Sequence, residues 1–108
     1  MGLFSFLFGG KKDKAKAAAK ALANILACLE LGVHIFDTSI AGLGGCPYAK
    51  GATGNVATED VVFMLQGMGI ETGIDLDALV DAGVFISQAL GRKPNSRVAT
   101  AVTNKRCQ

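Results

Sequence analysis

The glycine-rich loop over residues 41–55 is the feature that most constrains how this chain can fold. Its fifteen residues include five glycines, one proline and one cysteine, and they separate a short apolar run from a helix-like run. Glycine has no Cβ and tolerates positive φ, so the backbone of such a loop can approach a ligand closely. Cys46 stands in the middle of the loop and is a candidate nucleophile or acid–base group. We therefore expect the loop to carry a site.

The segments before the loop predict a helix followed by a strand. The alanine-rich residues 14–31 favour a helix, along which apolar side chains repeat at helical spacing: Leu22, Ile25, Leu26 and Leu29. Gly32 stands where a C-cap is expected. The β-branched and aromatic run from Val33 to Phe36 predicts a strand. The backbone groups of a lone strand need partners, so this order predicts a piece of a larger α/β fold.

Three further helices are predicted after the loop. Their expected N-caps are Thr58, Asp75 and Ser96. Two acidic residues, Glu59 and Asp60, fall in the first turn of the first of these helices, where carboxylates suit the helix dipole. The second helix should end at Gly91, and the last should be short, running through about Val102.

Charge is spread unevenly along the 108 residues. The net charge is +2, but residues 1–20 carry +4, residues 21–91 carry −7 and residues 92–108 carry +5. The net charge is too small to indicate nucleic-acid binding, and no arginine-rich stripe with interleaved aromatic residues supports it. The basic ends are predicted to be solvated tails, and the alternative is that they bind an anionic partner.

The number of cysteines and the lengths of the apolar runs predict the cellular compartment of the protein. Three cysteines without a CxxC pair argue against a disulfide framework and favour a reducing environment. No run reaches the roughly 18 apolar residues that span a membrane, and the apolar start lacks the basic residues of a secretory signal. We therefore expect a cytoplasmic protein whose residues 1–13 form a disordered apolar and basic leader. The alternative for this leader is a peripheral membrane foot.

Consecutive residues of the loop carry a resemblance to a known family. The run SIAGLGGCPYA over residues 39–49, continued by KGATGNVATED over residues 50–60, resembles the signature loop of the hydroxymethylglutaryl-CoA lyases. Three further runs also fit: ALANIL at 21–26, GIETG at 69–73 and ALGRK at 89–93. The resemblance extends from Ala21 to about Ala101.

This resemblance implies a fold and a reaction. Members of the family are TIM-barrel metallolyases that cleave 3-hydroxy-3-methylglutaryl-CoA to acetyl-CoA and acetoacetate, so the implied substrate is an acyl-CoA. Val33 to Asp37 would be the eighth barrel strand, which places the loop at the C-terminal mouth of the barrel. The resemblance implies that Cys46 is the catalytic thiol. It also implies that Asn55 binds a divalent metal, Mg²⁺ or Mn²⁺, through its side-chain oxygen.

Other parts of the family's machinery have no match in the sequence. The family carries a His-x-His metal pair before the first helix, whereas residues 14–20 contain no histidine, so Asn55 is the one metal ligand present. A TIM barrel takes about 250 residues. We therefore predict that residues 14–108 are an α/β, C-terminal fragment of a TIM (β/α)8 barrel. As it stands, the fragment should be mostly helical, with three long helices, one short helix and one strand.

Two functional hypotheses follow from this comparison. In the first, the chain is part of a carbon–carbon lyase that is inactive alone, because another chain must supply the remaining strands and metal ligands. In the alternative, it is a non-catalytic truncated or rearranged product that acts at most as a helical interaction module. The expected macromolecular partners are the remainder of a split barrel or a second copy of the chain, since an exposed apolar barrel face predicts self-association.

Overall fold

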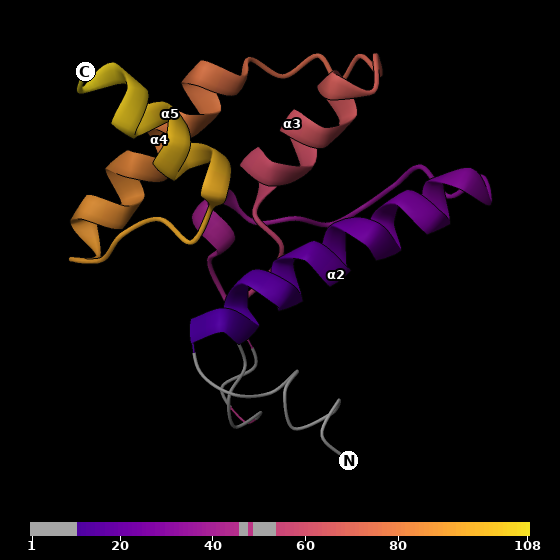
Figure 1. The fold of residues 1–108 in the computed structure, drawn as a ribbon, viewed down its shortest axis with the longest axis horizontal. Coiled ribbons are helices and arrows are strands. Elements are labelled where there is room, and N and C mark those ends of the chain that lie inside the picture. The colour runs from indigo at the N-terminus through magenta and orange to yellow at the C-terminus, as the bar shows by residue number, and fades with distance from the viewer. Residues whose placement is uncertain (1–10, 46–47, 49–53) are drawn as a thin grey trace. The chain divides into compact units, whose positions relative to one another are not determined.

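A computed structural model describes residues 11–45, 48 and 54–108 of the chain (Figure 1). The chain divides into two compact units, Met1–Phe36 and Asp37–Gln108. In the first unit, helix α2 spans Lys11–Glu30, so it begins three residues before the predicted start and confirms the helix. Gly32, at φ 90°, ends it as predicted, and the amide of Val33 donates to the carbonyl of Cys28 at 3.0 Å.

The strand predicted at Val33–Phe36 is wrong. The described residues contain no strand, and the backbone from Val33 to Thr38 carries no regular secondary structure. A single parallel bridge, between Ser39 and Ala57, takes its place nearby. The physical reason is the one that makes a lone strand unstable: a β-ladder needs a neighbouring strand to satisfy its N–H and C=O groups. The side chain of Ile35 is accordingly 81% exposed.

The second unit packs three helices around a short turn (Figure 1). Its elements are the 3-10 turn η1 (Ile40–Gly42), α3 (Thr58–Gly67), α4 (Leu76–Ala89) and α5 (Arg97–Arg106). The three helices contact one another, and both α3 and α4 contact η1. The core is built from small and β-branched side chains, namely Ala41, Ala57, Val61, Val62, Val80 and Ala99. No helix in the described part of the chain is both long enough and apolar enough to span a membrane.

Two of the three predicted N-caps are confirmed. The carboxylate of Asp75 accepts a hydrogen bond from the amide of Ala78 at 3.1 Å, and the hydroxyl of Ser96 accepts one from the amide of Ala99 at 3.0 Å. The third prediction is wrong by one residue, because Ala57 is the N-cap of α3 and contributes no side-chain bond. The hydroxyl of Thr58 is engaged elsewhere, in a hydrogen bond of 2.8 Å with that of Thr38.

Helix α5 is longer than predicted. It runs to Arg106, which makes it as long as α3. The guanidinium of Arg106 forms an ion pair with Asp77 at 2.6 Å and a second with Asp81, both on α4. These pairs join the end of α5 to α4.

Among the described residues, Ser87 has the one buried side-chain polar atom that makes no hydrogen bond. It is 1% exposed on α4, and its hydroxyl has no hydrogen-bond partner in that part of the chain. Burying an unpaired hydroxyl costs about 1–3 kcal/mol. We therefore expect Ser87→Ala to keep or raise the free energy of unfolding, by up to about 1 kcal/mol, in urea denaturation followed by circular dichroism. A loss of more than about 1 kcal/mol would show that the hydroxyl is bonded in solution.

Candidate functional site

The base of the glycine-rich loop is closed by backbone hydrogen bonds. The amide of Ser39 donates to the carbonyl of Val56 at 3.0 Å, and the amide of Thr58 donates to the carbonyl of Ser39 at 3.0 Å. These bonds form the parallel bridge between Ser39 and Ala57 and hold the two ends of the loop side by side. The residues next to this base are therefore held in place by the second unit.

Glu59 holds the tight turn that leads into the loop. Ala41 lies in the left-handed region, at φ 54° and ψ 18°, which is uncommon for a residue with a Cβ. Its amide donates to both carboxylate oxygens of Glu59, at 2.9 and 3.1 Å. Both residues are buried, so this hydrogen bond is shielded from water. The bond offsets the roughly 1–2 kcal/mol that a left-handed alanine costs.

The side chain of Asn55 lies across the loop base. Its amide nitrogen donates to the carbonyl of Leu43 at 3.0 Å. Gly44 leaves room for it, because a Cβ at this position would come within 2.6 Å of the Asn55 amide nitrogen. Since the nitrogen is bonded to the loop, the amide oxygen forms the other end of an oriented group. An exposed amide oxygen is a suitable ligand for a hard divalent cation.

One of the two predicted site residues lies among the residues that the structure describes. Asn55 lies at the loop base, whereas Cys46 falls outside the described residues, as do residues 47 and 49–53. Among the described residues, no group of three or more His, Cys, Asp or Glu side chains is arranged to hold a metal ion. Asn55 alone does not make a metal site, and any further ligands must come from elsewhere.

Burial sets the electrostatics of Glu59. The side chain is fully buried, and this loss of water raises the pKa of its carboxyl group above the ordinary value of 4.5. Hydrogen bonds from its own backbone amide and from the Ala41 amide oppose the rise, whereas the nearby charge of Asp60 adds to it. The folded state therefore binds the Glu59 proton more tightly than the unfolded state does.

A pH dependence of stability follows from this raised pKa. The stabilisation from protonated Glu59 is complete below pH 4.5, the ordinary value, and is lost as the pH rises through the folded-state pKa. The glutamine in Glu59→Gln cannot ionise. As the pH increases across this interval, the free energy of unfolding of the variant should therefore rise relative to that of the parent chain. Urea titrations of both proteins from pH 4 to pH 7 measure the difference. A difference that is constant with pH, or that falls, would contradict the prediction.

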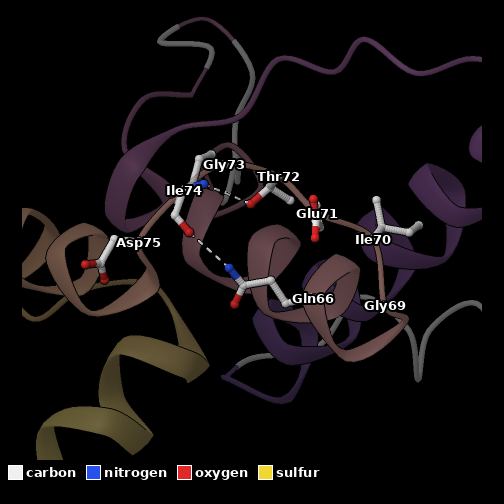
Figure 2. A pocket seen from close by; sticks show the side chains of 8 residues that line it. All are labelled: Gln66, Gly69, Ile70, Glu71, Thr72, Gly73, Ile74 and Asp75. Atoms are coloured by element: carbon white, nitrogen blue, oxygen red, sulfur yellow. Dashed lines mark hydrogen bonds between the residues drawn. The ribbon is translucent and has the colours of Figure 1, made fainter.

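An open groove lies on the connection between α3 and α4 (Figure 2). Its volume is about 630 Å³, and its lining comes from Gln66 and residues 69–75. The amide of Gln66 donates to the carbonyl of Ile74 at 3.0 Å, and the hydroxyl of Thr72 accepts from the Ile74 amide at 3.2 Å. The Asp75 side chain points away from these groups and caps α4. The groove contains neither predicted site residue, and the side chains of Gln66 and Thr72 bond the backbone of the connection.

The sequence did not identify the two buried carboxylates of α3 as the side chains that anchor the loop and α5. Glu59 and Asp60 lie in the first turn of α3, as predicted. In addition, the carboxylate of Glu59 accepts from the Ala41 amide, and that of Asp60 accepts from the Ser96 hydroxyl at 2.7 Å and the Val98 amide at 3.0 Å. One signal was present: two carboxylates directly precede the apolar pair Val61 and Val62, without a basic residue one turn later.

The chain has recognisable relatives. Residues 17–86 match the HMGL-like family model. The chain is 62% identical over 82 residues to the mitochondrial hydroxymethylglutaryl-CoA lyase of Gallus gallus, an alignment that covers 76% of this chain and 28% of that protein.

Solved structures agree with the sequence comparison. The crystal structure of hydroxymethylglutaryl-CoA lyase from Pseudomonas aeruginosa matches with a TM-score of 0.74 and 60% identity, over 79% of this chain and 28% of that one. An HMG-CoA lyase from Acinetobacter baumannii, in complex with coenzyme A and 3-methylmalate, matches with a TM-score of 0.71 and 47% identity, over 75% and 27% of the two chains. The chain thus spans 28% of the length of the first curated relative.

Proposed function

This chain belongs to the HMGL-like family, and we propose that it carries the C-terminal share of a hydroxymethylglutaryl-CoA lyase. The complete catalyst would be a TIM barrel that cleaves 3-hydroxy-3-methylglutaryl-CoA to acetyl-CoA and acetoacetate. Because the chain spans 28% of the length of the Gallus gallus lyase, the remaining strands would come from another polypeptide segment. By the same argument, residues 1–108 alone would not turn over the substrate.

The orientation of Asn55 is the observation that carries this proposal. Its amide nitrogen is bonded to the Leu43 carbonyl, and Gly44 gives the side chain room, so the amide oxygen has a defined direction at the loop base. We propose this oxygen as one ligand of the lyase metal, Mg²⁺ or Mn²⁺. Its chemistry fits a hard cation, but the described residues do not complete the ligand set. When bound, such an ion would polarise the oxygens of the substrate.

Cys46 would supply a proton in this reaction. Cleavage of the carbon–carbon bond leaves the electron pair on the acetyl-CoA enolate, and the enolate carbon must take up a proton to give acetyl-CoA. We propose the Cys46 thiol as the donor, on the resemblance of the loop, because Cys46 lies outside the described residues. The fixed loop base would serve to present this thiol at the mouth of the completed barrel.

An acyl-CoA is the substrate class that the comparisons favour. The Acinetobacter baumannii relative is in complex with coenzyme A and 3-methylmalate, and it matches this chain at 47% identity. We propose that the completed catalyst accepts the same class through its other segments together with this loop.

The experiment is an assay of the purified chain with 3-hydroxy-3-methylglutaryl-CoA and Mg²⁺, with acetoacetate as the readout. We expect no turnover above a blank without protein. Turnover by the chain alone that disappears in Cys46→Ala would contradict the need for a completing segment, while still supporting lyase chemistry.

One observation favours a second candidate, a non-catalytic helical interaction module. Two large aromatic side chains of the second unit face water: Phe63 on α3 is 57% exposed and Phe85 on α4 is 71% exposed. Exposed apolar side chains of this size favour association. Sizing chromatography of the parent chain and of Phe85→Ser would test this module: association that is independent of any lyase segment, and lost in the variant, would favour it.

A further inference from the structure

We propose that Glu59 is a positioning residue, which fixes the turn at Ala41 and, through that turn, the carbonyl that orients Asn55. This inference rests on the proposed function in one respect only, namely that Asn55 serves as a metal ligand. The coupling between Glu59 and Asn55 itself is argued from the described geometry.

Glu59 joins three elements at one buried point. It belongs to α3, its carboxylate accepts from the Ala41 amide of η1, and it contacts α4 at Gly83, where a Cβ would collide with its Oε1 atom. It is 0% exposed, which for a carboxylate demands a specific partner. The partners here are the Ala41 N–H, which both oxygens share, and the backbone amide of Glu59 itself.

A short chain of hydrogen bonds leads from Glu59 to Asn55. The Ala41 amide donates to Glu59, and the Ala41 carbonyl accepts from the amide of Asn95 at 3.0 Å, so both backbone polar groups of this residue are held. The Leu43 amide donates to the carbonyl of Ile40 at 3.0 Å, which ties Leu43 to the same turn. The Leu43 carbonyl then accepts from the Asn55 side chain. A change of the left-handed conformation at Ala41 would therefore move the acceptor that orients Asn55.

The chemistry of this anchor predicts which substitutions it tolerates. Glu59→Gln retains the length of the side chain and one carbonyl oxygen that can accept from Ala41. Glu59→Asp retains the charge but is one methylene shorter, so it cannot reach the turn from the same place on α3. If Glu59 has a merely structural role, both substitutions should affect Asn55 to similar extents. If Glu59 positions the turn, only the shorter side chain of Glu59→Asp should release Asn55.

The test uses the full chain, labelled with ¹⁵N, and follows the side-chain amide of Asn55 by NMR relaxation. In the parent chain and in Glu59→Gln, we expect this amide to be as rigid as the backbone of α3. In Glu59→Asp, we expect it to lose that rigidity, with the signal of the Ala41 amide shifted as its acceptor is lost. Asp60→Asn is the matched control: it alters the neighbouring buried carboxylate, and it should perturb Val98 while leaving Asn55 unchanged.

An Asn55 amide that stays rigid in Glu59→Asp, in a chain that remains folded and has lost the bond at Ala41, would overturn the proposal. Loss of Asn55 rigidity in Glu59→Gln, with the Ala41 bond intact, would overturn it as well. Titration with Mn²⁺ tests the proposed function separately. In the lyase completed by the missing segment, an Mn²⁺ requirement that Asn55→Ala leaves unchanged would refute the ligand role, while the coupling to Glu59 is still decided by the relaxation data.

Discussion

Gly83→Ala should lower the free energy of unfolding by about 1–3 kcal/mol. This is the opposite sign from an ordinary helix interior, where alanine is more stable than glycine by roughly 0.5–1 kcal/mol. The reason is steric, because a Cβ at position 83 would come within 2.4 Å of the Glu59 Oε1 atom. A shift of this oxygen would disturb its hydrogen bond with the Ala41 amide, at 2.9 Å in the buried core.

Gly67→Ala is the matched control for this prediction. Gly67 is also helical, at the end of α3, but nothing lies within 4 Å of its ideal Cβ position. It should show the ordinary gain in stability. Urea unfolding of both variants, followed by circular dichroism, measures the two changes. If Gly83→Ala were as stable as the parent chain, Glu59 would not occupy the space that the structure gives it.

Asp60→Ala should lower the free energy of unfolding by roughly 2–4 kcal/mol. Asp60 accepts two hydrogen bonds at the start of α5, from the Ser96 hydroxyl at 2.7 Å and the Val98 amide at 3.0 Å. Asp60 is 7% exposed and Ser96 is 4% exposed, so truncation leaves donors without water to replace the carboxylate. The Ser96 hydroxyl also caps α5, and loss of its own acceptor would weaken that cap.

An exposed carboxylate on the neighbouring helix serves as the control for Asp60. Asp77 pairs with Arg106, yet its side chain is 76% exposed. Such a pair is screened by water, and Asp77→Ala should change the free energy of unfolding by less than about 1 kcal/mol. Equal losses in Asp60→Ala and Asp77→Ala, measured by thermal unfolding of both variants, would contradict the assignment of Asp60 as the anchor of α5.

Much of the helical fold could be predicted from local sequence. The helices of the second unit follow from apolar spacing and from the caps Asp75 and Ser96, which act within a few residues of themselves. The conformation of Val33–Phe36 could not be predicted from local sequence. A strand forms only where distant residues supply hydrogen-bond partners for its backbone. The ion pairs at the end of α5 could not be predicted either, since Arg106 pairs with Asp77 and Asp81 of α4, which lie far from it in the sequence.

The family could be predicted from the sequence, but the architecture of the candidate site could not. The loop run around Cys46 and Asn55 indicated the family, and the match to the HMGL-like model confirms that prediction. The contact of Glu59 with Ala41 could not be predicted from the sequence. Ala41 lies 18 residues earlier, and its residue type gives no sign of a special backbone conformation. Only the fold shows that Ala41 is left-handed and that Gly83 leaves space for a carboxylate.

The most direct test of the account is complementation of an incomplete lyase. The Pseudomonas aeruginosa enzyme, deleted of the part that this chain matches, would be coexpressed with residues 1–108 and assayed for acetoacetate from 3-hydroxy-3-methylglutaryl-CoA. We expect activity with the parent chain that is lost in Cys46→Ala and reduced in Asn55→Ala. No activity with this chain, under conditions in which the enzyme's own deleted segment restores turnover, would contradict the proposal that it carries the C-terminal share of the catalyst.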